Sequence, residues 1–356
     1  MSDSKNNKSY RQIFDGVIEA TIKNAQKIAS KNPGLILTGA KIAYHQKRAA
    51  GIRAEYEKKG VVVPGVIMFS LQSRCNLTCK GCNINECDSF QKRSDMTDDE
   101  IISTISQAKK IGVSAVLFSG GEPLLKLPLI LQLAKMNPEI LFLVFTNGLL
   151  IDEKAAKIIG KCKNIVPMLC LEDFPDKSNV FCGTEEYKKL IDTCHSISKR
   201  GMFFGSSLTV TAENINSITD ENFIRDMVSG GVLAFVFVEY AQIDDKTKNL
   251  SLTKDQKSLL GEKIRKYSEM FPAVFISFPG DEENFGVCLA AGGGFLHVSP
   301  DGSLEACPAA PFSDTNLKEV SLTEALGSEL LRKIRENNGI LTDSGGGCVL
   351  FQKEEF

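Results

Sequence analysis

The 356-residue chain is 43% apolar and 24% charged and carries a formal net charge of -2, values of an ordinary globular protein. The near-neutral charge argues against bulk nucleic-acid binding. The polar start MSDSKNNKSYRQ is unlike a signal peptide, and no apolar run approaches the roughly 20 residues of a membrane span. We therefore expect a cytoplasmic protein.

Residues 1–60 read as a basic helical segment, exemplified by KIAYHQKRAAGIRAEYEKKG. We interpret it as a solvated helix packed on the following domain. The alternative is a weak interfacial contact with a membrane, which basic amphipathic helices make.

Residues 61–275 alternate between strand-like and helical patterns. TDDEIISTISQAKKIG predicts a helix with a capping box at Thr97 and Glu100 and an end at Gly112. The strand-like runs are almost continuously apolar, as in a parallel sheet covered on both faces. They are VVVPGVIMFSLQS, SAVLFSGG, ILFLVFTNG, NIVPMLCLE, MFFGSSLTV and VLAFVFVEY. Six β/α units in series predict a parallel barrel or partial barrel, with the chemistry in the loops at the carboxyl ends of the strands.

Residues 276–356 break this regularity and predict a small C-terminal extension. A glycine-rich loop leads to a hairpin that turns at Pro300, Asp301 and Gly302. The capped helix SLTEALGSELLRKIREN and the tail SGGGCVLFQKEEF follow.

The chain has eleven cysteines and only three histidines, His45, His195 and His297. Without export signals, an odd number of cysteines favours metal or redox use over a disulfide framework. Any metal site is therefore expected to use sulfur ligands.

The stretch RCNLTCKGC places three thiols at Cys75, Cys79 and Cys82. Thiolates bind both zinc and iron-sulfur clusters, and a loop with this spacing can wrap one corner of a cubane. The spacing alone is only suggestive. The motif SGGEP adds a second signal, because Gly120, Gly121 and Glu122 end the next strand, across the barrel mouth from the cysteine loop.

Together the two motifs resemble the radical SAM superfamily, over about residues 62–275. The resemblance implies an α/β fold, a partial (β/α)6 TIM-like barrel. It implies that Cys75, Cys79 and Cys82 hold a 4Fe-4S cluster whose fourth iron binds S-adenosylmethionine (SAM). Reductive cleavage of SAM would then give methionine and a 5'-deoxyadenosyl radical that abstracts hydrogen from a substrate, in a barrel that excludes water.

The resemblance also suggests further SAM contacts. Gly120, Gly121 and Glu122 should meet the methionine amino group, and Asn147 in FTNG matches a strand-end motif of these barrels. Glu172 in CLED could bind the ribose, and Ser207, or its neighbours Ser206 and Thr209, could face the cofactor. The alternatives are that Glu172 is a surface acid and that these hydroxyls only form hydrogen bonds to neighbouring strands.

Two positions depart from the family pattern. Gly81 stands where many relatives have an aromatic residue, and NVFCGT offers Phe181 and Cys182 where relatives often place an arginine that grips the SAM carboxylate. We expect this chain to hold SAM by other contacts. Cys182 could line the active site or be an inert loop thiol.

The C-terminal extension resembles the SPASM and twitch extensions of radical SAM enzymes. By that resemblance Cys288, Cys307 and Cys348 bind one auxiliary 4Fe-4S cluster; the alternatives are structural thiols or a partial zinc site. We interpret Cys162, Cys170 and Cys194 as buried apolar fillers.

The leading prediction is a radical SAM enzyme that takes electrons from a donor such as flavodoxin or ferredoxin. Its substrate is a peptide or protein, or a small molecule or lipid precursor. The alternatives are a non-catalytic iron-sulfur protein that transfers electrons or serves as a scaffold, and a zinc-binding module.

Overall fold

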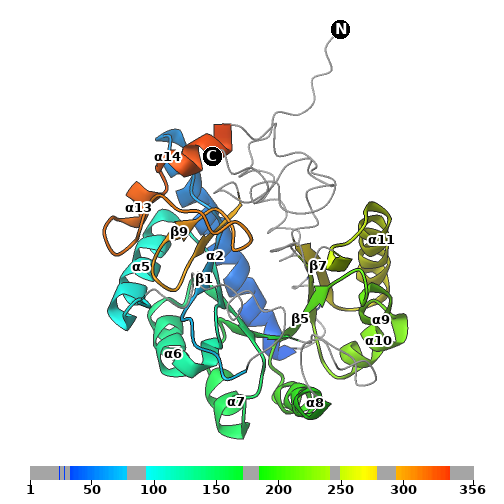
Figure 1. The fold of residues 1–356 in the computed structure, drawn as a ribbon. Helices are drawn as coiled ribbons and strands as arrows, with labels where there is room; N and C mark the ends of the chain where they lie inside the picture. The colour runs from blue at the N-terminus through cyan, green and yellow to red at the C-terminus, as the bar shows by residue number, and fades with distance from the viewer. Residues whose placement is uncertain are drawn as a thin grey trace.

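The computed structural model describes residues 24, 28, 33–77, 94–170, 184–240, 249–278 and 294–336. Within them the chain forms one curled nine-stranded sheet in the order β7-β6-β5-β4-β3-β2-β1-β8-β9 (Figure 1). All neighbouring strands run parallel except β8 and β9. The sheet confirms the expected partial barrel. Its strands are β1 (Val66–Ser70), β2 (Ala115–Ser119), β3 (Leu141–Thr146), β4 (Ile165–Cys170), β5 (Gly205–Val210), β6 (Ala234–Glu239), β7 (Val274–Phe278), β8 (Phe295–Val298) and β9 (Leu304–Glu305).

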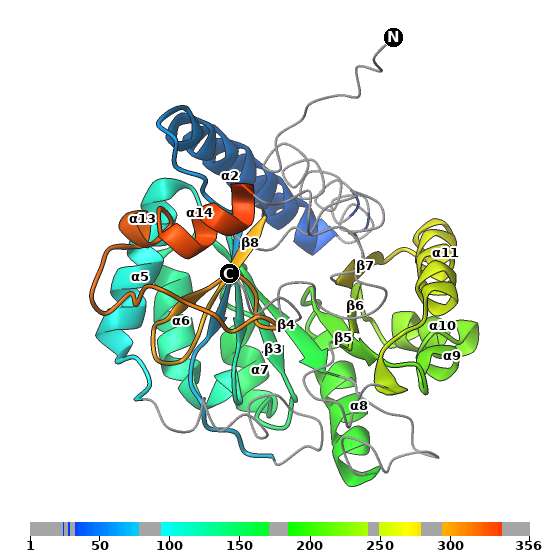
Figure 2. The same ribbon diagram turned by 45° about the horizontal axis from the view of Figure 1, so that its top comes forward.

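Helices follow most strands and lie around the outside of the sheet (Figures 1 and 2). The predicted capping box is present on α5: Thr97 and Glu100 bond each other's backbone N–H, and Gly112 ends the helix at φ 97°. The helices are α2 (Pro33–Lys58), α5 (Asp98–Ile111), η1 (Pro123–Lys126), α6 (Leu127–Met136), α7 (Glu153–Ile159), α8 (Thr184–Ser198), α9 (Ile215–Ile218), α10 (Glu221–Ser229), α11 (Lys254–Met270), α13 (Leu322–Ala325) and α14 (Glu329–Glu336).

The two faces of the sheet bury different cores. On the outer face, residues such as Phe69, Phe118 and Phe142 pack with the apolar side of the helices. On the inner face, Val166, Met168, Ala234 and Val274 form a second apolar cluster. Because side chains alternate along a strand, β3, β4, β6 and β7 contribute to both clusters. We call the side of the sheet away from α5–α11 the inner face.

The six barrel strands predicted from the sequence are β1–β6, and the structure adds β7, which the prediction missed and which extends the sheet beside β6. β8 is a strand of the predicted hairpin, but its parallel pairing with β1 was not predicted. The run AVFISF is short, so its pattern did not separate it from a loop. Residue 275 thus lies within β7, and the extension shares the barrel's sheet; the division at 60/61 and 275/276 stays an interpretation.

The predicted hairpin joins β8 to β9 and docks on the barrel. Gly302 adopts φ 90° in its turn, and Asp301 accepts hydrogen bonds from the Ser303 N–H and hydroxyl at 3.3 and 3.2 Å. The Met96 N–H donates to the Pro300 carbonyl at 2.7 Å. Further along, the Leu322 N–H donates to Gln107 Oε1 at 2.9 Å, which fixes α13 on α5 (Figure 2). The C-terminal segment is therefore held against the first β/α unit.

Helix α2 packs at the amino end of β2. Gln46 Nε2 donates to the Ser114 carbonyl at 2.9 Å, and Arg53, 1% exposed, donates from Nη1 to the Gly112 carbonyl at 2.5 Å. These contacts support the packed-helix interpretation. Ile36, Leu37 and Tyr44 are exposed on the same helix. No helix in the described part of the chain is long and apolar enough to cross a membrane; a weak surface contact stays a prediction.

We predict that Arg53→Met lowers the free energy of unfolding by about 2 kcal/mol, because it removes a charge-assisted hydrogen bond to a buried carbonyl. Arg48→Met, at an exposed position of the same helix, should change it by less than about 0.5 kcal/mol. Urea unfolding followed by circular dichroism measures both. Equal stabilities of the two variants would show that α2 is not docked through Arg53.

Candidate active site

The loops after β1 and β2 lie in direct backbone contact. The Leu71 N–H donates to the Ser119 carbonyl at 3.0 Å, the Gly121 N–H to Gln72 at 2.8 Å and the Glu122 N–H to Arg74 at 3.0 Å. These bonds continue the β1–β2 ladder past the strands. The cysteine loop therefore begins its course beside the SGGEP motif, not across the barrel mouth as expected, because β1 and β2 are neighbours in the sheet.

Only glycine fits at the centre of this contact. A Cβ at Gly121 would lie 1.8 Å from the Arg74 carbonyl oxygen and 3.0 Å from the Cys75 nitrogen. Gly120 has φ 109°, and a Cβ there would lie 2.7 Å from the Gln72 oxygen. The two glycines thus let the backbone that carries Cys75 approach the end of β2.

Glu122 ties the SGGEP loop to the loop after β3. Its carboxylate is 1% exposed and accepts hydrogen bonds from Leu124 N at 2.9 Å, Thr146 Oγ1 at 2.7 Å and Asn147 N at 3.0 Å. Burial raises the pKa of Glu122 above its ordinary value, although these hydrogen bonds oppose the shift. The Glu122 carbonyl accepts from Gln72 Nε2 at 2.8 Å. The carboxylate and the backbone carbonyl of Glu122 are thus both hydrogen-bonded within the protein.

Asn147 connects the third loop to the cysteine loop. Its Nδ2 donates to Asn76 Oδ1 at 2.9 Å, and its Oδ1 accepts from Leu149 N at 3.1 Å. Asn76 follows Cys75, whose side chain is partly exposed. The structure thus brings Cys75, Gly120, Gly121, Glu122 and Asn147 together at the carboxyl ends of β1–β3.

The remaining predicted SAM contacts divide by strand face. Ser206 is fully buried on the outer face and donates to the Leu169 carbonyl at 3.1 Å, so its hydroxyl satisfies a strand neighbour. Ser207 is paired with Cys170 in the β4–β5 register and lies on the inner face, as does Thr209. Glu172 lies outside the described residues. On β5 the structure therefore favours Ser207 or Thr209 over Ser206.

Of the six predicted cluster ligands, the structure describes two. Cys75 is partly exposed at the end of β1, and Cys307 is 8% exposed shortly after β9. Cys79, Cys82, Cys288 and Cys348 lie outside the described residues, as do Gly81 and Cys182. Among the predicted fillers Cys194 is buried, which raises the pKa of its thiol to about 12; Cys162 and Cys170 are partly exposed.

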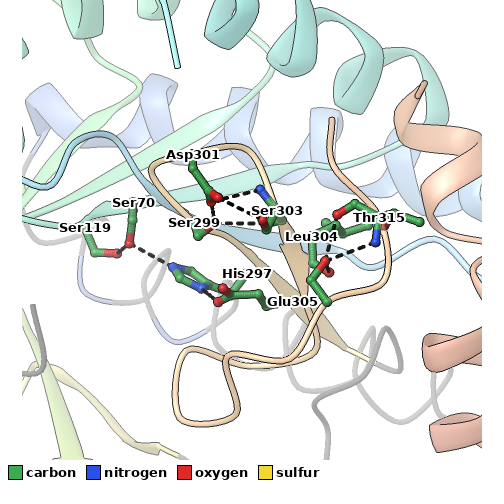
Figure 3. A network of polar contacts seen from close by, with 10 residues as sticks. Ser70, Ser119, His297, Ser299, Asp301, Ser303, Leu304, Glu305 and Thr315 are labelled. Atoms are coloured by element: carbon green, nitrogen blue, oxygen red, sulfur yellow. Dashed lines mark hydrogen bonds and ion pairs between the residues drawn. The ribbon is translucent and has the colours of Figure 1, made fainter. Parts of the chain in front are cut away.

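His297 stood in the sequence analysis only as one of three histidines, and the structure places it in a buried polar network (Figure 3). His297 Nε2 lies 2.8 Å from Ser70 Oγ, and Nδ1 lies 2.6 Å from Glu305 Oε2. The apolar neighbours of His297 in FLHV could have indicated a buried histidine. Its partner Ser70, however, is 227 positions away, and no local pattern indicates that contact.

The described residues fit an iron-sulfur cluster with SAM. A partly exposed thiol stands at the end of β1, and two side-chain-free glycines border it. In the described part of the chain, the carbonyl oxygens of Gly120 and Gly121 take no part in these loop contacts, so they could accept from an amino group.

We predict that Glu122→Gln changes the dependence of stability on pH. The raised pKa means that the wild-type carboxyl stabilises the fold below its unfolded pKa and loses that contribution as the pH rises through the folded value. The variant loses the hydrogen bond from Asn147 N, which lowers its free energy of unfolding by about 1 kcal/mol relative to the wild type. This loss of stability should become smaller as the pH rises.

Urea unfolding at several pH values measures this loss of stability. Glu221→Gln is the control of opposite sign, because Lys266 and Arg225 lower the pKa of Glu221; its loss of stability should grow with pH. A loss of stability in Glu122→Gln that also grows with pH would contradict the raised pKa of Glu122.

Comparisons with known proteins relate the strands that carry this site to a known family. The sequence model of the Radical SAM superfamily matches residues 69–224. Fe-coproporphyrin III synthase of Methanosarcina barkeri is 25% identical over 58% of this chain, although the match spans only 54% of that relative. A probable GTP 3',8-cyclase of Methanosarcina mazei is 27% identical over 68% of this chain and 76% of its own length.

Solved structures share the fold. Streptococcus suis SuiB bound to S-adenosylmethionine superimposes with a TM-score of 0.65 at 18% identity, covering 86% of this chain and 79% of SuiB. anSMEcpe with bound AdoMet and a peptide gives 0.59 at 16% identity, over 81% and 93% of the two chains. The chain therefore carries a radical SAM domain at residues 69–224 and shares its fold with a protein whose structure was solved with bound S-adenosylmethionine.

Proposed function

We propose that Cys75, Cys79 and Cys82 bind the 4Fe-4S cluster and leave one iron for SAM. The observation that carries this assignment is the close approach of Gly121 to Arg74 and Cys75, which joins the cysteine loop to SGGEP. When bound, the cluster and SAM supply an electron and a 5'-deoxyadenosyl radical that abstracts hydrogen from the substrate.

The chain's own residues position and enclose SAM. The carbonyls of Gly120 and Gly121 accept from its amino group, while Glu122 holds their loop through Thr146 and Asn147. Asn147 fixes the start of the cysteine loop through Asn76. Glu172 and Ser207 bind the ribose side of SAM, a role that the inner-face position of Ser207 supports.

We further propose an auxiliary 4Fe-4S cluster on Cys288, Cys307 and Cys348. Its support is the position of Cys307 at the end of a hairpin that pairs with β1. The cysteine loop that follows β1 and the segment of Cys307 are thus built on adjacent strands. A cluster on Cys307 would belong to the same rigid sheet as the SAM site.

A small organic molecule is the substrate class that we favour, because the names of the two curated relatives refer to a porphyrin and to GTP. A peptide or protein is the second class, since the titles of related structures name bound peptides. We place the reaction in the cytoplasm, with flavodoxin or ferredoxin as the electron donor that radical SAM enzymes need.

The test is anaerobic reconstitution followed by an assay for 5'-deoxyadenosine after reduction with SAM. The intact protein should form 5'-deoxyadenosine, and Cys75→Ala, Cys79→Ala and Cys82→Ala should each abolish it. Cys162→Ala is the matched control and should retain it. Clusters without SAM cleavage would instead support an electron-transfer or scaffold protein, and stoichiometric zinc would support a zinc module.

Iron counting on the same samples tests the auxiliary cluster. Joint replacement of Cys288, Cys307 and Cys348 should reduce the iron content from about eight to about four atoms per chain, because one of two 4Fe-4S clusters is lost. An unchanged iron content would show that these thiols are structural.

A further inference from the structure

Four polar side chains form a row on the inner face across four adjacent strands. They are Ser119 on β2, Ser70 on β1, His297 on β8 and Glu305 on β9 (Figure 3). Successive contacts measure 3.5 Å between the serine hydroxyls, 2.8 Å from Ser70 Oγ to His297 Nε2 and 2.6 Å from His297 Nδ1 to Glu305 Oε2. The row runs from the carboxyl end of β2, next to Gly120, to β9, which leads into the segment that carries Cys307.

The row is buried except at one end. His297 and Glu305 are each 2% exposed and Ser70 is 5% exposed, whereas Ser119 is partly exposed and directly precedes Gly120. Among the described residues, Glu305 is the charged group in contact with His297. Burial of a carboxylate is costly unless it is paired and hydrogen-bonded, which the imidazole provides.

A structural tie between β8 and β9 would need only the His297–Glu305 pair. The row instead continues through Ser70, which is a cross-strand diagonal neighbour of His297 because Met68 is its register partner. Apolar side chains would hold this hairpin equally well, since replacing buried ion pairs by apolar residues is often neutral or stabilising. A continuous row with one accessible end is the arrangement that proton transfer requires.

The donors and acceptors define two states that differ by one proton. With a neutral imidazole, Nδ1–H donates to Glu305, Nε2 accepts from the Ser70 hydroxyl, and Ser70 Oγ can accept from Ser119. With an imidazolium, Nε2–H donates to Ser70, and Glu305 balances the charge. Nδ1 is hydrogen-bonded to Glu305, and Nε2 is hydrogen-bonded to Ser70. Among the described residues, the proton that distinguishes the two states therefore reaches or leaves Nε2 through Ser70.

We propose that this row is a proton relay in which His297 takes up a proton from an O–H or N–H group of the substrate bound at the inner face. An O–H or N–H is required because the accessible group is a serine hydroxyl, which relays protons between hydrogen-bonding atoms. The relay rests on the proposed function for its substrate. It assigns His297 and Glu305 a role in positioning a proton and makes Ser119 the group that meets the substrate.

The transfer balances without an added oxidant or reductant. The substrate X–H bond breaks and its electron pair stays on X; Ser119 gains that proton and passes its own to Ser70. Ser70 passes its proton to His297 Nε2, where the new N–H bond gives an imidazolium beside the Glu305 carboxylate. The 3.5 Å step between the serines must shorten, as hydrogen bonds in active sites commonly do on ligand binding.

The test is ¹⁵N NMR of histidine-labelled, cluster-loaded protein without SAM, in which His297→Gln assigns the resonances among three histidines. The His297 Nε2 resonance should distinguish the neutral and the protonated state, with rapid exchange between the two states. Ser70→Ala should slow that exchange roughly tenfold or more, because it removes the hydroxyl that contacts Nε2. Ser70→Thr, which keeps a hydroxyl, should restore it.

Ser206→Ala is the matched control, since Ser206 is a fully buried strand serine on the outer face. It should leave the exchange unchanged. Equal exchange in Ser70→Ala and Ser206→Ala, or no protonation change at Nε2, would overturn the relay. If Ser70→Ala does not fold, Ser119→Ala at the partly exposed end decides, with the same expected slowing. The measurement needs no SAM cleavage, so its failure is distinct from failure of the proposed function.

Discussion

The close approach of the Gly121 backbone to Arg74 and Cys75 is the contact on which the site depends. Two hydrogen bonds, from Gly121 to Gln72 and from Glu122 to Arg74, extend the ladder of β1 and β2 beyond the strands. The loop that carries Cys75 therefore starts from a defined position. Glu122 and Asn147 extend the same constraint to β3 through a buried carboxylate and a side-chain amide. One loop junction thus positions three motifs.

The C-terminal hairpin connects the loops after β1–β3 with the segment that carries Cys307. β8 pairs with β1 on the side opposite β2, so the strand that leads into the cysteine loop is held between SGGEP and the hairpin. This arrangement puts the proposed SAM loops, the His297 network and the Cys307 segment on five adjacent strands, β3-β2-β1-β8-β9. Helix α2 packs at the amino end of β2, away from these loops. The chemistry and the packing thus occupy opposite ends of the sheet, as is usual in β/α barrels.

Much of this arrangement follows from local sequence patterns. The apolar runs indicated β1–β6 and therefore placed RCNLTCKGC, SGGEP and FTNG at strand ends, and the capping signals of α5 were correct. The patterns did not indicate β7, because a short strand resembles a loop, and they did not indicate that the hairpin strand β8 pairs with β1. They also gave the wrong relation between Cys75 and Gly121, since strand order is set by long-range pairing. The contacts of the buried Glu122 carboxylate and the contact of Ser70 with His297 depend on such pairing too, and only the folded chain shows them.

The most direct test of this account is the iron content and 5'-deoxyadenosine yield of Gly121→Ala after anaerobic reconstitution. The added Cβ must displace the Arg74–Cys75 backbone, so we expect a loss of about four iron per chain, one cubane, and of SAM cleavage. Gly51→Ala, on the exposed side of α2 with open space around its Cβ, should keep both. A Gly121→Ala protein that binds iron and cleaves SAM like Gly51→Ala would contradict the account.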